Sequence, residues 1–416
     1  MSALDLAAVR SRFPALSRVQ DGRPVVFADA PGGSQVPDTV IEAVSRRYRD
    51  GISNMDGAFV VSEETEELAA AARRAGADLV GAEPNQIVFG ANSTSLLLHL
   101  SRSFARTIGP GDTVVVTRLD HDANVRPWVL AARDAGAAVR WVDLHTEDAT
   151  LDLDSFDEAL TEGPALVAFT LASNGVGTVT PAADLVARAK SAGALVAVDG
   201  VHFAQHRSIG FRDLGADMVT VSPYKVFGPH LGMVAAKPEI LDVWDAYRVR
   251  PAEHYPSPER WETGTQNHEG FAGFIAAVDY LAALGRDTGA GGETVRADQV
   301  TAAFDAIGAH ERTLATRFLE GLASIPQARL YGVPGTDRLA ERTSTFAVRL
   351  GDQHPRDTSK ALAERGIFTW DGHYYAMELF ERLDILETGG AVRIGFCHYH
   401  TLDEVDRVLD ALTELA

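Results

Sequence analysis

The chain has 416 residues and 46% of them are hydrophobic, so it can bury a large core and is expected to form one large and one smaller domain. Its formal net charge of −20 argues against a nucleic-acid or anionic-membrane partner, because nothing neutralises phosphate in bulk. The single cysteine, Cys397, excludes an internal disulfide framework and favours a reducing compartment, and a structural role is the simplest interpretation of this thiol.

The N-terminal stretch MSALDLAAVRSRFPAL lacks the pattern of a signal peptide. Asp5, Arg10 and Arg12 interrupt it, so no long apolar run follows a cationic lead. No segment of the chain approaches the roughly 20 uninterrupted apolar residues that a transmembrane helix needs. These features predict a soluble, cytoplasmic protein.

Short β-branched runs alternate with longer helical patterns between about residues 85 and 237. The runs are 86–90, 113–118, 138–144, 165–173, 195–200, 217–222 and 232–237. This alternation predicts an α/β fold in which a mostly parallel, seven-stranded sheet is covered by helices on both faces. Ligands bind at the carboxyl ends of strands in such sheets. Polar residues that follow the runs are therefore candidate site residues: Asn92 to Thr94, His121, Asn174, Asp199 and Ser222.

The C-terminal third is predicted to form a small α+β domain. Residues 269–285 have the apolar stripe of a helix, and residues 285–293 are typical of a flexible turn region. We therefore expect a large domain over 1–285, whose N-terminal segment packs with a small domain over 286–416. The small domain is predicted to contain a helix near 299–325, strands at 328–332, 344–350 and 391–397, and a closing helix at 401–415.

Asp199 and Lys225 carry the strongest chemical signal. Asp199 ends a predicted strand, and Lys225 follows about 26 residues later in a Ser-Pro-Tyr-Lys turn. Pyridoxal 5′-phosphate (PLP) needs both groups, because a lysine amine forms the imine and a carboxylate keeps the pyridine nitrogen protonated. Over nearly its whole length the sequence resembles the class V aminotransferase family of fold type I PLP enzymes, and in particular its cysteine desulfurase branch. The resemblance implies that Lys225 holds PLP as a Schiff base and that Asp199 is the partner of the pyridinium.

The segment GANSTSLLLHL is predicted to be a strand that leads into a helix, and the free N–H groups of such a helix start can bind phosphate. A Ser or Thr cap by itself is structural in most helices. The resemblance implies that Ser93 and Thr94 contact the PLP phosphate and that Ser222 donates to it. Tyr224 replaces a histidine that desulfurases place before the lysine, so that phosphate contact is expected to be altered or lost. Thr265 matches a threonine that reaches the phosphate of the neighbouring subunit, which implies a homodimer with shared sites.

Three further residues are implied to contact the cofactor. His121 lies in RLDHDANVRPW, which resembles the family's Glu-His-His-Ala-Asn segment, where the first histidine stacks on the cofactor ring and can shuttle protons. Asn174 resembles the asparagine that bonds the phenolic oxygen of PLP. His202 stands where desulfurases carry a glutamine against the same oxygen. A solvated loop histidine is the alternative for His121, and a core histidine is the alternative for His202.

The substrate end of the predicted site departs from the desulfurase pattern. Arg393 matches the arginine that grips the substrate carboxylate through two parallel N–H bonds. A desulfurase also needs a cysteine thiolate on a mobile loop, which corresponds here to WDGHYYAMELF. Tyr375 stands at the cysteine position, with Tyr374 and His373 beside it, so persulfide chemistry is not expected. Tyr375 is a candidate catalytic residue and His373 a candidate substrate contact, although the tyrosines could instead only form the pocket wall.

These features predict a PLP-dependent lyase or transferase that acts at Cα and Cβ of a small amino acid, with Lys225 as the proton carrier. A true aminotransferase is the alternative among enzymes, and a PLP-binding protein without turnover is the alternative of another class. The presence of both His121 and Arg393 counts against the latter. Metal chemistry through His398 and His400 is not expected, because they share a face of the predicted strand but no third ligand can be named.

Overall fold

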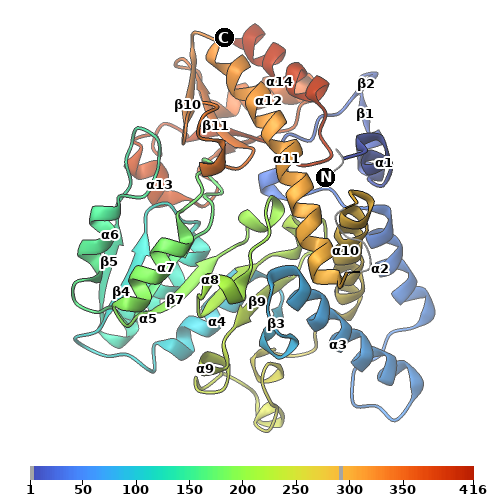
Figure 1. The fold of residues 1–416 in the computed structure, drawn as a ribbon, viewed down its shortest axis with the longest axis vertical. Coiled ribbons are helices and arrows are strands. Elements are labelled where there is room, and N and C mark those ends of the chain that lie inside the picture. Colours follow the sequence, from blue (N-terminus) through green and yellow to red (C-terminus); the bar gives the residue numbers. More distant parts are fainter. Residues whose placement is uncertain (1–3, 290–293) are drawn as a thin grey trace.

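The computed structural model describes residues 4–289 and 294–416, which contain two main sheets (Figure 1). Over these described residues the large sheet has seven strands in the order β3-β9-β8-β7-β6-β4-β5. Their bounds are β3 Ile87–Gly90, β4 Thr113–Thr117, β5 Ala138–Val142, β6 Leu166–Thr170, β7 Leu195–Asp199, β8 Met218–Val221 and β9 Gly232–Ala236. The neighbouring strands β8, β7, β6, β4 and β5 pair in parallel, whereas β9 is antiparallel to both of its neighbours, β8 and β3. The prediction of a mostly parallel seven-stranded sheet is confirmed.

The strands of the large sheet are buried because apolar clusters cover both faces. Along β4, Val114 and Val116 belong to one cluster, while Val115 belongs to the other. The first cluster is completed by helices α4 Ser93–Phe104 and α5 Arg126–Ala135, and the second by α3 Val60–Val80, α7 Ala182–Ser191 and α10 His268–Asp287. Full burial of each valine contributes roughly 1.5–3 kcal/mol relative to exposure. The β-branched runs of the sequence therefore become the centre of the fold.

A second, antiparallel sheet forms the centre of the C-terminal part of the described chain. Its four strands are β10 Ala328–Tyr331, β11 Thr345–Leu350, β12 Trp370–Gly372 and β13 Ala391–Gly395, in the order β10-β11-β13-β12. The sequence predicts three of them and misses β12. Three residues carry no readable periodicity, and β12 is a strand only because it pairs with β13.

Long helices connect the two sheets. The helix α11, Arg296–Ala323, runs from beside α10 up to the small sheet, where it meets α14, Leu402–Leu415 (Figure 1). The helices predicted at 269–285, 299–325 and 401–415 are thus present as α10, α11 and α14, with ends shifted by a few residues. Since α10 continues to Asp287, the turn region starts later than predicted, and its residues 290–293 lie outside the described residues. The remaining α-helices among the described residues are α1 Leu6–Ser11, α2 Asp38–Asp50, α6 Leu153–Leu160, α8 Phe211–Leu214, α9 Pro238–Leu241, α12 Pro355–Glu364 and α13 Met377–Arg382.

The segment before α2 lies against the small sheet. Val26 forms a parallel bridge with Ile367, and Asp29 forms one with Gly395. Val26 also belongs to the apolar cluster of the small sheet. The domain boundary near residue 285 stays a prediction. Among the described residues, no helix is long and apolar enough to cross a membrane.

Candidate active site

One pocket at the carboxyl ends of the large-sheet strands collects most of the predicted cofactor contacts. Its wall includes Ser93, Thr94, His121, Asn174, Asp199, His202, Ser222 and Lys225. These residues follow β3, β4, β6, β7 and β8, so the parallel strands bring together side chains that are far apart in the sequence. Four other predicted residues lie outside this wall: Thr265, His373, Tyr375 and Arg393.

Lys225 lies in a short 3-10 turn directly after β8, where Pro223 fixes the first backbone angle. The side chain is 7% exposed, and Nζ donates a hydrogen bond to the carbonyl oxygen of Pro31. The pKa of Lys225 is lowered to about 7, mainly by burial and also by the charge of Arg393, whereas the carboxylate of Asp199 opposes the shift. A large fraction of this amine is therefore uncharged at neutral pH, and the uncharged amine is the nucleophile.

Asp199 ends β7 inside the same pocket. It is buried, and its Oδ1 accepts a hydrogen bond of 2.7 Å from the backbone N–H of Val201. Burial raises the pKa of Asp199 to about 6, while the Val201 N–H and the charge of Lys225 act in the opposite direction. The carboxyl group is thus mainly ionised at neutral pH and can face a cationic ring nitrogen.

Asp120 is a second buried carboxyl group, and sequence reasoning misses it. Thr117 Oγ1 donates to one of its oxygens, and Asn124 Nδ2 donates to the other at 2.7 Å. Burial raises the pKa of Asp120 to about 8, and the charge of Asp199 raises it too, so Asp120 keeps its proton at neutral pH. The available signal was its place directly before His121. Asp120 holds the turn that carries this histidine.

The N-terminus of α4 points at the pocket. Asn92 caps the helix, because its side-chain oxygen accepts a hydrogen bond of 2.9 Å from Ser95 N. Ser93 Oγ lies 2.7 Å from Ser222 Oγ and 3.0 Å from the carbonyl oxygen of Val221. Helix N–H groups and two adjacent hydroxyls make this end of the pocket suitable for a phosphate group.

Tyr224 lines the same pocket as Ser93 and Ser222. Its ring stacks on His230 with centroids 4.9 Å apart and planes at 9°. Its carbonyl oxygen accepts hydrogen bonds from both N and Oγ of Ser34. Gly33 lies so close that an added Cβ would be 3.2 Å from the Tyr224 ring. Tyr224 therefore connects the lysine turn to the glycine-rich segment 32–34.

His121 caps the 3-10 turn 122–124 through its own side chain. Nδ1 accepts a hydrogen bond of 3.0 Å from Ala123 N, so the neutral ring carries its proton on Nε2. The pKa of His121 is lowered to about 3, first by burial and then by the charges of Lys225 and Arg393. The ring stacks on Tyr375 with centroids 5.5 Å apart and planes at 29°. His121 is thus a neutral, flat group at the pocket wall.

Asn174 and His202 each keep one buried atom without a hydrogen-bond partner in the described part of the chain, namely Oδ1 and Nδ1. His202 Nε2 already contacts the hydroxyls of Thr343 and Thr345 at 3.1 and 3.2 Å. Asn174 Nδ2 donates to the carbonyl oxygen of Tyr374 at 2.8 Å. An unpaired buried polar atom costs about 1–3 kcal/mol, which favours a polar ligand beside these residues.

Arg393 lies on β13, just beyond the pocket wall. It is buried, and its NH1 donates to the carbonyl oxygen of Asn174 at 2.9 Å. The pKa of Arg393 is lowered by burial to about 10, so the guanidinium stays charged at neutral pH. Its carbon Cζ lies 4.3 Å from the centre of the Tyr374 ring. Asp29 is also close, and burial raises the pKa of that carboxyl group to about 6.

The segment that corresponds to the desulfurase loop contains β12, a tight turn at residues 373–376 and the start of α13. Tyr374 is buried beneath Arg393, whereas Tyr375 is 68% exposed and covers His121. His373 does not reach the pocket wall, and its Nδ1 accepts from Tyr375 N at 3.2 Å. The predicted substrate contact of His373 therefore stays a prediction.

Three other residues that the sequence singles out lie outside the wall of the Lys225 pocket: Thr265, His398 and His400. Thr265 lines a separate hollow together with His99 and Tyr247, so a single chain does not bring it to Lys225. His398 and His400 do not lie on a strand, because β13 ends at Gly395; this corrects the expectation of a shared strand face. Within residues 4–289 and 294–416, no group of three His, Cys, Asp or Glu residues could hold a metal ion.

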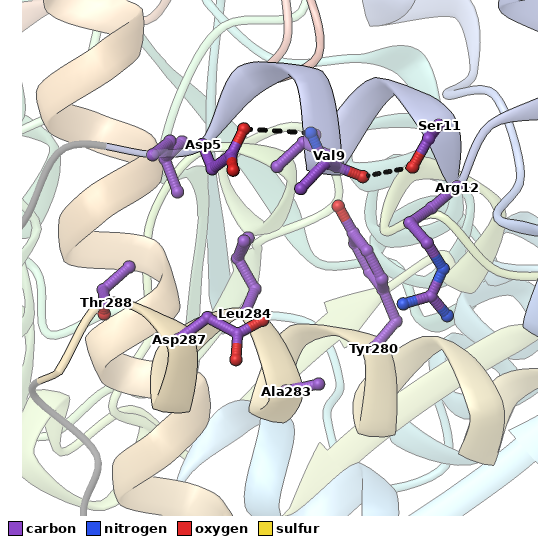
Figure 2. Close-up of a pocket in the computed structure, with 11 residues that line it drawn as sticks. Asp5, Val9, Ser11, Arg12, Tyr280, Ala283, Leu284, Asp287 and Thr288 are labelled. Atoms are coloured by element: carbon purple, nitrogen blue, oxygen red, sulfur yellow. Dashed lines mark hydrogen bonds between the residues drawn. The ribbon is translucent and has the colours of Figure 1, made fainter.

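A further hollow lies between α1 and α10 (Figure 2). Two of the polar groups drawn there serve α1 itself: Asp5 accepts from Ala8 N at 3.0 Å, and Ser11 Oγ donates to Ala8 O at 2.8 Å (Figure 2). Tyr280 on the opposite side bonds His398 Nε2 at 2.7 Å. The paired lysine and carboxylate instead single out the Lys225 pocket as the candidate active site.

Comparisons with known proteins agree with this geometry. Residues 26–408 match the family model described as aminotransferase class-V. A probable cysteine desulfurase from Streptomyces coelicolor is 31% identical over 428 residues, which cover 98% of this chain and 96% of that protein. A protein of Mycobacterium tuberculosis that is described as uncharacterized is 32% identical over 415 residues, which cover 99% of this chain and 100% of that protein.

Two solved structures of cysteine desulfurases are also similar. The enzyme CsdA from Escherichia coli, in its S-sulfonic acid form, superposes with a TM-score of 0.81 at 26% identity, with 100% of both chains covered. The apo enzyme from Thermococcus onnurineus NA1 superposes with a TM-score of 0.88 at 24% identity, covering 100% of this chain and 98% of that one. The second likeness shows the fold alone.

Proposed function

Because this chain belongs to the class V aminotransferase family, we propose that it is a lyase or transferase acting at Cα and Cβ of a small amino acid, without a persulfide-forming cysteine. The family membership makes it a PLP-dependent enzyme, and its fold is the fold type I that cysteine desulfurases share. The substrate class, the reaction and the thiol-free chemistry are our inference beyond that membership.

The pocket residues fit PLP. Lys225 offers a buried, partly uncharged amine, and Asp199 offers a carboxylate for the pyridine nitrogen. The start of α4 with Ser93 and Ser222 suits the phosphate, and the unpartnered Nδ1 of His202 can donate to the phenolic oxygen. When bound, PLP supplies an electron sink that stabilises negative charge at Cα.

Three side chains would act on the substrate. Arg393 stays charged and keeps its Nε without a partner in the described chain, so the guanidinium can bind a carboxylate. Lys225, with a pKa of about 7, can hold or move a proton at Cα. His121 stays neutral and presents its Nε2–H beside the cofactor position.

The observation that carries the thiol-free chemistry is the state of Cys397. It is the one cysteine of the chain, it is 0% exposed, and burial raises the pKa of its thiol well above the usual value. A thiol in this state is a poor nucleophile. Tyr375 stands where we expect the desulfurase thiol. A sulfur-accepting step therefore has no suitable residue in this sequence.

A true aminotransferase is the second candidate. The description of the matching family model favours it, and such a reaction needs the same lysine, carboxylate and arginine.

We also propose a homodimer in which Thr265 reaches the phosphate site of the neighbouring chain. The exposed hollow that contains Thr265 is compatible with this contact between chains.

The decisive assay incubates the purified, PLP-loaded enzyme with L-cysteine and a thiol reductant. Alanine, pyruvate and sulfide are then quantified by mass spectrometry and colorimetry. We expect no multiple-turnover formation of alanine with sulfide, while pyruvate with sulfide would identify β-elimination. A keto acid formed from an amino acid without a β leaving group, with the amino group recovered on an added keto-acid acceptor, would identify the aminotransferase. Sustained alanine and sulfide production that is lost in Cys397→Ser would refute the thiol-free assignment, because the cysteine would then be the sulfur acceptor.

A further inference from the structure

The turn that joins β12 to α13 holds two successive residues in an unusual backbone conformation. Tyr374 has φ 50° and Tyr375 has φ 60°, so both occupy the left-handed region. Residues with a Cβ rarely adopt this region, and two bulky side chains in a row do so even more rarely. Such strain persists only where the surrounding structure enforces it, and it is concentrated at functional sites.

Hydrogen bonds from three directions hold this turn. Asn174 Nδ2 donates to the carbonyl oxygen of Tyr374 at 2.8 Å, and Asp122 N donates to the carbonyl oxygen of Tyr375 at 2.7 Å. The hydroxyl of Tyr374 donates to the carbonyl oxygen of Ala391 on the small sheet. The turn is therefore attached both to the loops after the large-sheet strands and to the small sheet.

The left-handed backbone sends the two rings to two different functional groups. The ring of Tyr374 lies under the guanidinium of Arg393, with Cζ 4.3 Å from its centre. The ring of Tyr375 stacks on His121, with centroids 5.5 Å apart. A guanidinium over an aromatic face is stabilised by the ring quadrupole, and stacked rings restrict each other's orientation.

We propose that the Tyr374–Tyr375 turn is a positioning element that sets the guanidinium of Arg393 and the imidazole of His121 relative to each other. Asn174 completes the element, because its side chain bonds the turn while its carbonyl oxygen accepts from Arg393 at 2.9 Å. Tyr375 is then a positioning residue and not the catalytic residue considered from the sequence. This inference rests on the proposed function, in which Arg393 binds the substrate carboxylate and His121 faces PLP.

The role of Tyr374 is tested by comparing a ligand with a carboxylate and one without. Tyr374→Leu removes the ring beneath Arg393, and Tyr374→Phe is the matched control that keeps the ring. The spectral change of bound PLP is titrated with L-cysteine and with cysteamine. We expect Tyr374→Leu to weaken the apparent affinity for L-cysteine about tenfold and to leave that for cysteamine unchanged, whereas Tyr374→Phe stays near the wild type. Equal losses for both ligands would overturn the role of Tyr374.

The role of Tyr375 is tested by separating stability from orientation. Tyr375→Gly relieves the left-handed strain but removes the ring, and Tyr375→Phe keeps the ring. We expect Tyr375→Gly to keep or raise the melting temperature while it weakens the visible circular dichroism of bound PLP and lowers kcat. Tyr375→Phe should preserve all three quantities. An unchanged dichroism and kcat in Tyr375→Gly would overturn the proposal.

Failure of the positioning role can be told apart from failure of the proposed function. If the wild-type protein shows no spectral response of PLP to any amino acid, the proposed function is wrong. If the wild type responds and Tyr374→Leu and Tyr375→Gly respond in the same way, the enzyme assignment stands and the positioning role is wrong.

Discussion

Burial shifts the pKa values of the two charged residues Lys225 and Asp199 in opposite directions. It disfavours the ammonium of Lys225, whose pKa falls to about 7, and the carboxylate of Asp199, whose pKa rises to about 6. Each charge partly offsets the penalty of the other. The pKa values of both groups are thus closer to neutral pH than those of the same groups in water. Such shifted pKa values are typical of functional sites.

The cofactor-free protein should show this burial as a pH-dependent stability. The unfolded chain binds the Lys225 proton up to the ordinary pKa of 10.5, whereas the folded chain releases it near 7, so the free energy of unfolding rises with pH between these values. Lys225→Met should therefore stabilise the cofactor-free protein most below about pH 7, and the gain should shrink by roughly 2–3 kcal/mol by about pH 9. Urea unfolding of both proteins at several pH values measures it.

Asp199 strengthens the same trend, because it is ionised and unpaired at high pH once the lysine is gone. Wild type and Lys225→Met share every other titratable group, so their difference isolates this pair. A stabilisation by Lys225→Met that is constant from about pH 6 to about pH 9 would show that Lys225 keeps its ordinary pKa in the folded chain.

At the scale of elements, the start of α4 can approach the sheet only because β9 begins with a glycine. A Cβ added at Gly232 would collide with the backbone of Asn92, which caps α4, and of Ser93, the first residue of the helix; both line the pocket. Gly232→Ala should destabilise the protein by about 1–3 kcal/mol and weaken PLP binding, because the helix start must move away.

Gly109→Ala is the matched control for this prediction. An added Cβ there meets no atom within 4 Å, and the φ of Gly109 is outside the left-handed range. Thermal unfolding and PLP titration of both variants test the contact. Equal behaviour of Gly232→Ala and Gly109→Ala would mean that the closeness of α4 to β9 is unimportant for the site.

The elements differ in how far local sequence determines them. The buried strand 113–117 is a continuous β-branched run, and α14 begins at a capping box formed by Thr401 and Glu404, so both are readable locally. The strand β12 is not readable, because Trp370–Gly372 becomes a strand only through pairing with β13. Propensity also argues against left-handed tyrosines, and tertiary hydrogen bonds impose that conformation at residues 374 and 375.

The residues of the candidate site also differ in how far the local sequence predicts them. Residues at or soon after strand ends, such as Asp199 and Asn174, are placed by the parallel sheet, and the pocket wall contains both. Asp120 was missed because one aspartate in a loop carries no signal of burial. The partners of Arg393 and His121 were missed because ring contacts between distant segments leave no periodic pattern in a sequence.

At the scale of the whole molecule, the segment 243–255 carries several exposed apolar side chains, and one of them lies beside Thr265. Val243, Tyr247, Val249 and Tyr255 are between 44% and 74% exposed, and Tyr247 lines the same hollow as Thr265. Exposed apolar side chains that form a contiguous patch mark surfaces that bind another protein. A second copy of this chain is the partner that the proposed shared site requires.

A mixed dimer tests whether Thr265 serves the neighbouring site. Thr265→Val should weaken PLP binding, and Lys225→Ala should abolish PLP that borohydride can fix. If Thr265 acts across the interface, co-expressed and exchanged chains rebuild one intact site in each hybrid dimer, so an equal mixture should recover about a quarter of the wild-type activity. Size-exclusion chromatography with light scattering checks that dimers form. If Thr265 acts within its own chain, no hybrid contains an intact site, and the mixture should show no more activity than its two components measured separately.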